Sequence, residues 1–407
     1  QLIDVPIWAQ QDIVLCNHFM SDLQATRFIE ASRNKKGEFG QRGITQSLIG
    51  LNTTELGEKN KLYPVKKKNR YLIPSGDQFK YNPTCEDAIQ KDVAFLHHSR
   101  IGKYSTKYQA LCHLISQSDG TIFIYSQSKQ VGIKTISMML EENGMTRYVD
   151  SESKQQFEPF LSEVNSTPET QIFKGLSYIY VDGDIDNAIV NEWFDHYNKN
   201  NIEVMPGIHG KNIKVILGSD KVAQGVNLFR IREVHIMGPW LNLNKTEQII
   251  GRGTRSYGHH LLTESKRNIT IYLHTSYIPP NSSEEIKTLL GKKGILSADE
   301  IVESLSYFSA DQYNYLISYR KKIRELQVLQ ILIQNAIDCD LNIYLNNMKH
   351  IKVQLIDSQN HHREYKKANT CALLNVTTQQ YCKNNMEITC IQNLKDSTRT
   401  KLDNSTY

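Results

Sequence analysis

Short apolar runs alternate with helix-like segments through the middle of the chain. Between the runs, as at 128–143, apolar residues recur on one face of a helix, and Gly144 follows as a typical helix-ending glycine. Continuous apolar strands that alternate with helices predict a parallel sheet covered on both faces, and therefore an α/β fold. The expected strands are 121–126, 177–181, 213–217, 233–237 and 269–274.

The flanking regions have a weaker pattern. Residues 12–33 begin apolar and continue with helical spacing, whereas 34–82 is polar and predicts loops with little regular structure. The basic run 66–70 is interpreted as a solvated loop in preference to a phosphate contact. Residues 299–345 are mostly helical in pattern, and the chain beyond about 354 is polar and loop-like.

Composition narrows the class of protein. The 407 residues leave room for two or three domains, and 39% hydrophobic with 22% charged residues is a globular composition. A net charge of +5 does not by itself indicate a nucleic-acid partner. Neither a signal peptide nor an apolar run near 20 residues is present, so we expect no membrane partner.

Seven dispersed cysteines form no Cys-x-x-Cys pair, which argues against a zinc ribbon. Such cysteines are typical of reduced thiols in a cytosol-like compartment, and we expect a cytoplasmic location. The adjacent His259 and His260 are interpreted as a surface pair, because no third ligand lies nearby in the sequence. No metal site is expected.

Two segments carry the candidate chemistry. Ser219-Asp-Lys-Val-Ala-Gln-Gly-Val-Asn227 follows one predicted strand, and Gln248-Ile-Ile-Gly-Arg-Gly-Thr-Arg255 follows the next. Ligand sites in parallel sheets lie beyond the carboxyl ends of the strands, and both segments, like Ser126-Gln127, fall after strands. Arg252 and Arg255 are three residues apart and so share one face of a helical turn. Guanidinium groups fork onto phosphate oxygens, and such arginines can accelerate phosphoryl transfer by roughly a thousandfold or more.

These segments resemble motifs V and VI of the superfamily 2 helicases. Motif V is matched at Ser219, Ala223, Gly225 and Asn227, and motif VI at Gln248, Gly251, Arg252 and Arg255. Residues 121–127 resemble motif IV. The resemblance implies a RecA-like sheet flanked by helices, as in the C-terminal lobe of these enzymes, and a helicase or translocase that uses ATP with Mg²⁺ on DNA or RNA.

The resemblance also implies a role for each matched residue. Arg252 and Arg255 would act as catalytic arginine fingers. Nucleotide contacts would come from Gly225, Asn227, Gln248 and Gly251. The nucleic-acid backbone would be held by Ser126, Gln127, Ser219 and Lys221.

A narrower resemblance points to helicases of nucleocytoplasmic large DNA viruses, such as poxvirus nucleoside triphosphatase I and the early transcription factor small subunit. It rests on residues 125–133, 141–144, 231–236 and 336–339. The chain departs from that pattern at 257–260, where Tyr-Gly-His-His replaces the usual Ser-His. The resemblance implies a link to the viral transcription machinery, and a viral factory or virion as the location.

Other helicase motifs are absent from the sequence. No Gly-x-x-x-x-Gly-Lys-Ser/Thr phosphate loop exists, and the Asp-Glu of residues 299–300 begins a helix and does not follow a strand. The ATP-binding lobe is therefore expected upstream of Gln1 or in another chain, and this chain alone should not hydrolyse ATP efficiently. We expect 1–105 to be the end of a first RecA-like lobe plus linker, 106–280 the C-terminal RecA-like domain, and 281–407 a helical extension with a polar tail.

Three hypotheses follow. The first is the C-terminal part of an ATP-dependent helicase or translocase. The second is a catalytically inactive transcription-factor or scaffold subunit that keeps the fold. An unrelated α/β metabolic enzyme is disfavoured, because no Gly-x-Gly-x-x-Gly follows the first strand and no nucleophile constellation is present.

Overall fold

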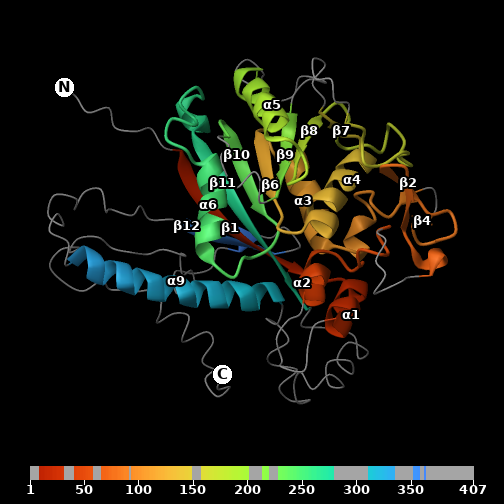
Figure 1. Cartoon of the computed structure of the whole chain (residues 1–407), viewed down its shortest axis with the longest axis horizontal. Helices are drawn as coiled ribbons and strands as arrows, with labels where there is room; N and C mark the ends of the chain where they lie inside the picture. The colour runs from red at the N-terminus through yellow and green to blue at the C-terminus, as the bar shows by residue number, and fades with distance from the viewer. Residues whose placement is uncertain are drawn as a thin grey trace, which may run out of the picture.

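A single sheet of nine strands forms the centre of the molecule (Figure 1). The computed structural model describes residues 9–31, 41–57, 66–90, 93–148, 157–200, 213–219, 228–278, 310–334, 352–357 and 362–363. All neighbouring strands of this sheet are parallel except the β12–β13 pair. In spatial order the strands are β13 (His362–Arg363), β12 (Lys352–Asp357), β1 (Gln10–Phe19), β11 (Asn268–Tyr277), β10 (Ile231–Ile236), β6 (Thr121–Tyr125), β9 (Ile213–Gly218), β8 (Ser177–Val181) and β7 (Thr146–Arg147).

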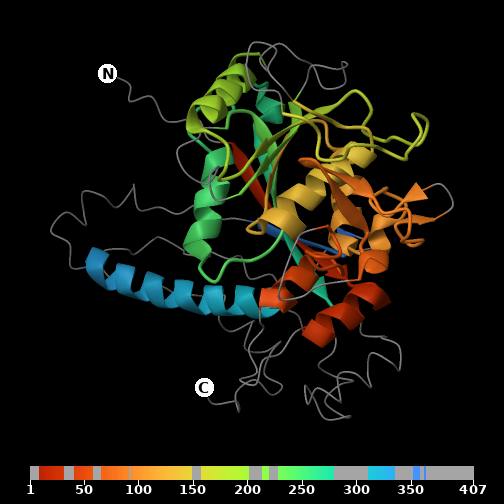
Figure 2. The same ribbon diagram turned by 45° about the vertical axis from the view of Figure 1, so that its right-hand side comes forward.

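Helices cover both faces of the sheet (Figures 1 and 2). On one face lie α3 (Thr106–Gln117) and α4 (Thr135–Glu142), and on the other lie α5 (Asn187–Asn200) and α6 (Leu243–Gly253). The division follows from right-handed crossovers, because the strand order advances across α3 and α4 but runs backwards across α5 and α6. The predicted α/β fold with a parallel sheet is confirmed, and each of the five predicted strands is present.

The predicted helix 128–143 is interrupted near its start. Residues Lys129–Lys134 (η3) form a π-helical turn, and Gly132 has a non-helical backbone before α4 begins. A Cβ atom at Gly132 would lie 2.2 Å from the hydroxyl oxygen of Ser126, so the close approach requires glycine. Gly144 ends the helix with a φ of 93°, as predicted.

The sheet crosses both boundaries expected from the sequence. Strand β1 pairs with β11 over its whole length, so the assignment of 1–105 to the end of another lobe does not extend to β1. Beyond the expected boundary at 280, α9 (Ala310–Gln334) packs on β11, α2 and α6. Strand β12, in the segment expected to be loop-like, pairs with β1.

Residues between β1 and α3 form a small layer of short elements beside the sheet. The prediction of little regular structure at 34–82 is wrong for the described part, which contains a helix and a hairpin. A buried amide ties this layer together, because Gln24 donates to the Gln46 carbonyl. The elements are α1 (Asp22–Ala31), α2 (Gln41–Leu48), η1 (Lys67–Asn69), β2 (Leu72–Ser75), β3 (Gln78–Tyr81), β4 (Ile89–Gln90), β5 (Val93–Ala94) and η2 (Ile101–Lys103).

A buried ion pair attaches α9 to the sheet. The Lys107 ammonium lies 2.6 Å from the Asp311 carboxylate, with side-chain exposures of 0% and 3%. Lys107 also donates to the Met237 carbonyl, and Asp311 accepts from the Ser276 amide. Both charges are thereby compensated, which a buried ion pair requires. Across the described residues, no helix has the length and apolar character needed to cross a bilayer.

Breaking this pair should destabilise the protein. We expect Lys107→Met to lower the free energy of unfolding by about 3–5 kcal/mol, because Asp311 is left as a buried charge without a counter-ion. The double variant Lys107→Met/Asp311→Asn removes both charges and keeps an acceptor for Ser276, so it should cost clearly less than the single one. Urea unfolding followed by circular dichroism measures both costs, and equal losses would contradict the role of charge compensation.

Candidate nucleic-acid and nucleotide interface

Helix α6 has one buried face and one exposed face. Its buried positions are Leu243, Thr246, Ile249 and Gly253, and its N-terminus is capped by the Asn242 side chain, which accepts from the Asn244 amide. Gln248 and Arg255 are exposed and Arg252 is half-buried. Gln248 and Arg252 are four residues apart and share the side of α6 that faces away from the core. Helix α6 ends at Gly253 and Arg255 follows it, so the expectation that both arginines share one face of a helical turn is wrong for Arg255.

The two glycines of this helix have different roles. A Cβ at Gly253 would lie 3.0 Å from Ile269 and 3.1 Å from Val234, so the helix approaches β10 and β11 closely at this point. A Cβ at Gly251 would meet nothing within 4 Å. Gly253 therefore serves packing, whereas Gly251 leaves an open backbone surface beside Arg252.

The two arginines lie near each other. Burial and the neighbouring Arg255 charge lower the pKa of Arg252. Two cations held close together on a solvent-facing surface favour an anionic ligand with several oxygens, such as a phosphate chain.

The loop after α6 has a constrained backbone. Tyr257 has a φ of 58°, and the Gly258 amide donates to the Arg255 carbonyl. A Cβ at Gly258 would lie 2.9 Å from that same carbonyl oxygen. The position of Arg255 is thus fixed by a tight turn that requires glycine. His259 is buried and bonds the Ile231 carbonyl, so the prediction of a surface histidine pair is wrong for His259, while His260 is exposed.

A second group of predicted residues lies at the carboxyl ends of β6 and β9. Ser126 and Ser219 follow these two neighbouring parallel strands, so they lie at one edge of the sheet. Ser126 is buried and accepts from the Ser128 amide, whereas Gln127 is exposed. Gln127 is the member of the Ser126–Gln127 pair that is available to a ligand. Lys221, Gly225 and Asn227 lie outside the described residues.

The structure places these two groups at opposite edges of the sheet. Helix α6 starts after the carboxyl end of β10 and runs back, so that Gly253 reaches Ile231 and Ile269 at the amino ends of β10 and β11. Its 11 residues span about 16 Å. The expectation that 248–255 lies at the carboxyl edge with the other predicted residues is therefore wrong, because a helix that follows a parallel strand returns to the other edge.

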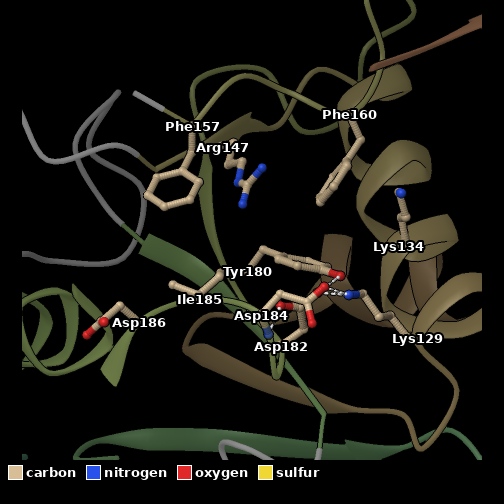
Figure 3. Close-up of a pocket in the computed structure, with 10 residues that line it drawn as sticks. All are labelled: Lys129, Lys134, Arg147, Phe157, Phe160, Tyr180, Asp182, Asp184, Ile185 and Asp186. Carbon is tan, nitrogen blue, oxygen red and sulfur yellow. Dashed lines mark hydrogen bonds and ion pairs between the residues drawn. The ribbon is translucent and has the colours of Figure 1, made fainter. Parts of the chain in front are cut away.

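A pocket of about 350 Å³ opens at the carboxyl edge, at the end of β8 (Figure 3). Its floor includes Tyr180 and Asp182 from β8 and the turn after it. Lys129 reaches across from η3 and pairs with Asp182 at 2.9 Å and with Asp184. Burial acts to lower the pKa of Lys129, but bonds to Asp184 and Asp182 raise it overall, so Lys129 stays cationic.

Aromatic rings surround a second cation of this pocket. The Arg147 guanidinium lies 5.1 Å from the ring centre of Phe157, 4.6 Å from that of Phe160 and 5.2 Å from that of Tyr180. The loop that carries Phe160 is held by Glu141, which accepts from the Phe160 and Leu161 amides. Burial raises the pKa of Glu141 to about 7. Stacking keeps Arg147 extended towards the pocket.

The site residues predicted from the sequence did not include Lys129, Arg147 or Asp182. Lys129 lies in the segment 125–133, which carries the narrower viral resemblance, and Asp182 directly follows a predicted strand, so both had a positional signal. Arg147 had no positional signal in the sequence, because its partners come from a loop and from another strand.

Known proteins with similar sequences include viral proteins named as helicases and as transcription factor subunits. No protein-family model matches the chain. Two Acanthamoeba polyphaga mimivirus proteins named as ATP-dependent RNA helicases are 30% identical over 182 residues and 26% identical over 340 residues, which cover 44% and 76% of this chain. An African swine fever virus early transcription factor large subunit homologue is 23% identical over 228 residues, 55% of this chain. The resemblance found in the sequence pointed to the small subunit of the early transcription factor, whereas this relative is named as the large subunit.

These matches cover only part of each relative. The aligned residues are 27%, 27% and 20% of the three relatives. Among solved structures, the C-terminal part of the Fun30 ATPase domain has a TM-score of 0.29 and 16% identity, with 54% of each chain covered. T4 UvsW has a TM-score of 0.36 and 11% identity, with 86% of this chain and 42% of UvsW covered.

The relatives and the motif residues agree. The chain is thus similar in sequence to viral proteins named as ATP-dependent RNA helicases and as an early transcription factor subunit, and its motif residues resemble those of the superfamily 2 helicases.

Proposed function

We propose that this chain is the C-terminal part of an ATP-dependent nucleic-acid helicase or translocase of viral origin, linked to transcription. The observation that carries the proposal is the solvent-facing side of α6, which presents Gln248 and Arg252, with the exposed Arg255 directly after the helix, while the opposite side is packed on β10 and β11. Arginines in this arrangement can neutralise the charge that develops on a transferring phosphoryl group.

The nucleotide would lie at the amino edge of the sheet. In this proposal Arg252 and Arg255 contact its phosphates, Gln248 and the open backbone at Gly251 line the same surface, and Gly225 and Asn227 contribute from the segment before β10. ATP and Mg²⁺ would be held mainly by a second RecA-like lobe, in the same protein or in a partner chain. This chain alone would then hydrolyse ATP poorly.

Nucleic acid would lie at the carboxyl edge. Gln127 and Ser219 offer hydrogen-bonding groups there, and Lys221 would add a positive charge. Ser126 supports the turn that presents Gln127. Contacts of this kind hold the sugar–phosphate backbone and read no sequence, so either DNA or RNA would be accepted.

One segment connects the two edges. Strand β9 ends at Gly218 at the carboxyl edge and β10 begins at Ile231 at the amino edge, so residues 219–230 pass from one to the other. At the far end, the Arg230 amide donates to the Gly258 carbonyl, and the Gly258 amide donates to the Arg255 carbonyl. Arg230 is thus linked to Arg255 by two backbone hydrogen bonds through Gly258.

A second candidate function is a catalytically inactive transcription-factor or scaffold subunit. The early transcription factor name of the African swine fever virus relative favours it. The two functions differ in whether Arg255 matters for turnover, since a scaffold needs no arginine finger. In either case the chain would act with viral transcription machinery in the cytoplasm, in a viral factory or in the virion.

Replacing the exposed arginine tests the enzyme. In the protein assembled with its ATP-binding lobe, we expect Arg255→Ala to reduce nucleic-acid-stimulated ATPase activity by about a thousandfold or more, because the phosphoryl charge loses its partner. Affinity for a single strand should stay the same. Steady-state ATP hydrolysis and fluorescence anisotropy measure the two effects.

The matched control is Arg320→Ala, which removes an exposed arginine from α9. It should leave both activities at the parental level. Equal ATPase rates for Arg255→Ala and the parent would refute the finger role, and a parent without any ATPase activity would favour the scaffold.

Gln127 provides an independent test at the other edge. We expect Gln127→Ala to weaken single-strand binding by about 3- to 10-fold, the cost of one net hydrogen bond, without changing ATP affinity. Gln117→Ala removes an exposed glutamine at the amino edge and should have no effect on binding. Identical strand affinities for the two variants would place the nucleic acid elsewhere.

A further inference from the structure

Three histidines form a hydrogen-bonded file across three neighbouring strands. His18 of β1 lies 2.9 Å from His274 of β11, and His274 lies 3.0 Å from His235 of β10, each measured between ring nitrogens. All three are at most 2% exposed. The file ends at Glu233, whose carboxylate is 3.1 Å from His235 Nε2.

The carboxylate fixes which ring nitrogens carry protons. An ionised Glu233 only accepts, so His235 Nε2 carries a proton and its Nδ1 accepts from His274 Nε2. His274 Nδ1 must then accept from His18 Nε2. For neutral imidazoles this leaves His18 Nδ1 as a bare lone pair, and that atom is buried without a hydrogen-bond partner among the described residues. Burial lowers the pKa of His18 to about 3 and that of His274 as well, which keeps both rings neutral.

Cys16 completes a cluster of donors on the same face of the sheet. It lies two residues before His18 on β1, so both side chains point to one face, and it is directly opposite His274 in the strand register. One ligand atom from each of Cys16, His18 and His274 lies within 4.8 Å of the other two. The Tyr315 hydroxyl of α9 is also buried without a hydrogen-bond partner among the described residues. It is close enough to Cys16 for a charge on that residue to contribute to the raised pKa of Tyr315.

We propose that Cys16, His18 and His274 bind one Zn²⁺ ion, or another divalent cation of similar preference for sulfur and nitrogen. Tetrahedral coordination with bonds of about 2.0–2.3 Å separates the ligand atoms by about 3.3–3.6 Å, so each atom needs to move by roughly 1 Å or less. The Tyr315 hydroxyl or a water fills the fourth position.

Metal binding at this cluster would release one proton and move another. On binding, the Cys16 thiol loses its proton to solvent and a zinc–sulfur bond forms. The proton that His18 donated to His274 moves from Nε2 to Nδ1 of His18, so both rings stay neutral while His18 Nε2 and His274 Nδ1 turn their lone pairs to the metal. His274 Nε2 still donates to His235, and His235 to Glu233, which is the outer carboxylate–histidine support that metal-bound imidazoles usually have.

The ion would have a structural effect separate from the proposed helicase function. It would join β1 to β11, two strands whose ligands are 256 residues apart in the chain. Its loss would loosen the attachment of β1 to β11, and with it that of β12 and β13, which follow β1 in the strand order.

Metal binding can be measured directly on the 407-residue chain. After chelator treatment and dialysis against Zn²⁺, mass spectrometry of the metal content should give one ion per chain, and Co²⁺ should produce a thiolate charge-transfer band. Cys16→Ser and His274→Gln should lose the band and weaken Zn²⁺ binding by at least about tenfold. Cys112→Ser, which removes another buried cysteine, should behave like the parent.

A graded variant guards against misfolding of the ligand variants. Glu233 does not bind the metal in this proposal and lies at the outer end of the file, so Glu233→Gln should keep the fold and weaken Zn²⁺ binding by about 10-fold or more through loss of the supporting charge. A parent chain that takes up no Zn²⁺, or a Cys16→Ser chain that keeps the Co²⁺ band, would overturn the proposal.

Discussion

The parallel direction of the strands is the constraint on which the rest of the structure depends. Each connection between two parallel neighbours has to cross from the carboxyl edge of the sheet to its amino edge. Helix α6 therefore ends at the edge opposite the one where β10 ends, and it takes Arg252 and Arg255 with it. The connection from β9 to β10 has to make the same crossing, because these strands are parallel in the sheet. The fold thus separates the two predicted groups of site residues and connects them by covalent chain.

Close packing converts this topology into a defined position for the arginines. The packing between α6 and the β10–β11 pair at position 253 favours glycine, because a Cβ would come within 3.0 Å of Ile269 and 3.1 Å of Val234. A larger residue would push the helix outward and displace Arg252, one residue away. The turn at Tyr257–Gly258 then fixes Arg255 through a backbone bond. The position of the arginines at the surface is therefore set by close packing of the residues beneath them.

The sequence predicted the sheet well because its central strands are apolar on both faces. Ile122, Ile124, Ile179 and Ile216 are all buried, so a continuous apolar run was a sufficient signal. Strand β1 was missed because it alternates between buried and half-buried positions and its partner β11 lies more than 250 residues away. The spacing of residues in the sequence identified the motif VI residues. It could not predict at which edge of the sheet they lie, since spacing does not say where a returning helix ends. The Cys16–His18–His274 cluster depends on contacts between strands that are remote in sequence, and Arg147 depends on contacts with a loop and with β8. Local pattern holds no information about either.

Buried polar groups gather where distant parts of the chain meet. At the β1–β11–β10 seam the three histidines hydrogen-bond to one another from strand to strand, with only His18 Nδ1 left without a partner among the described residues. Close to them Lys107 and Asp311 join α3 to α9. An apolar seam would bury as much surface but would accept a shifted strand, whereas hydrogen bonds and ion pairs are lost when a strand slips by one residue and its side chains change faces. The seam therefore specifies the register of β1 against β11. That register matters for the proposed site, because β11 is also the strand against which Gly253 of α6 is packed.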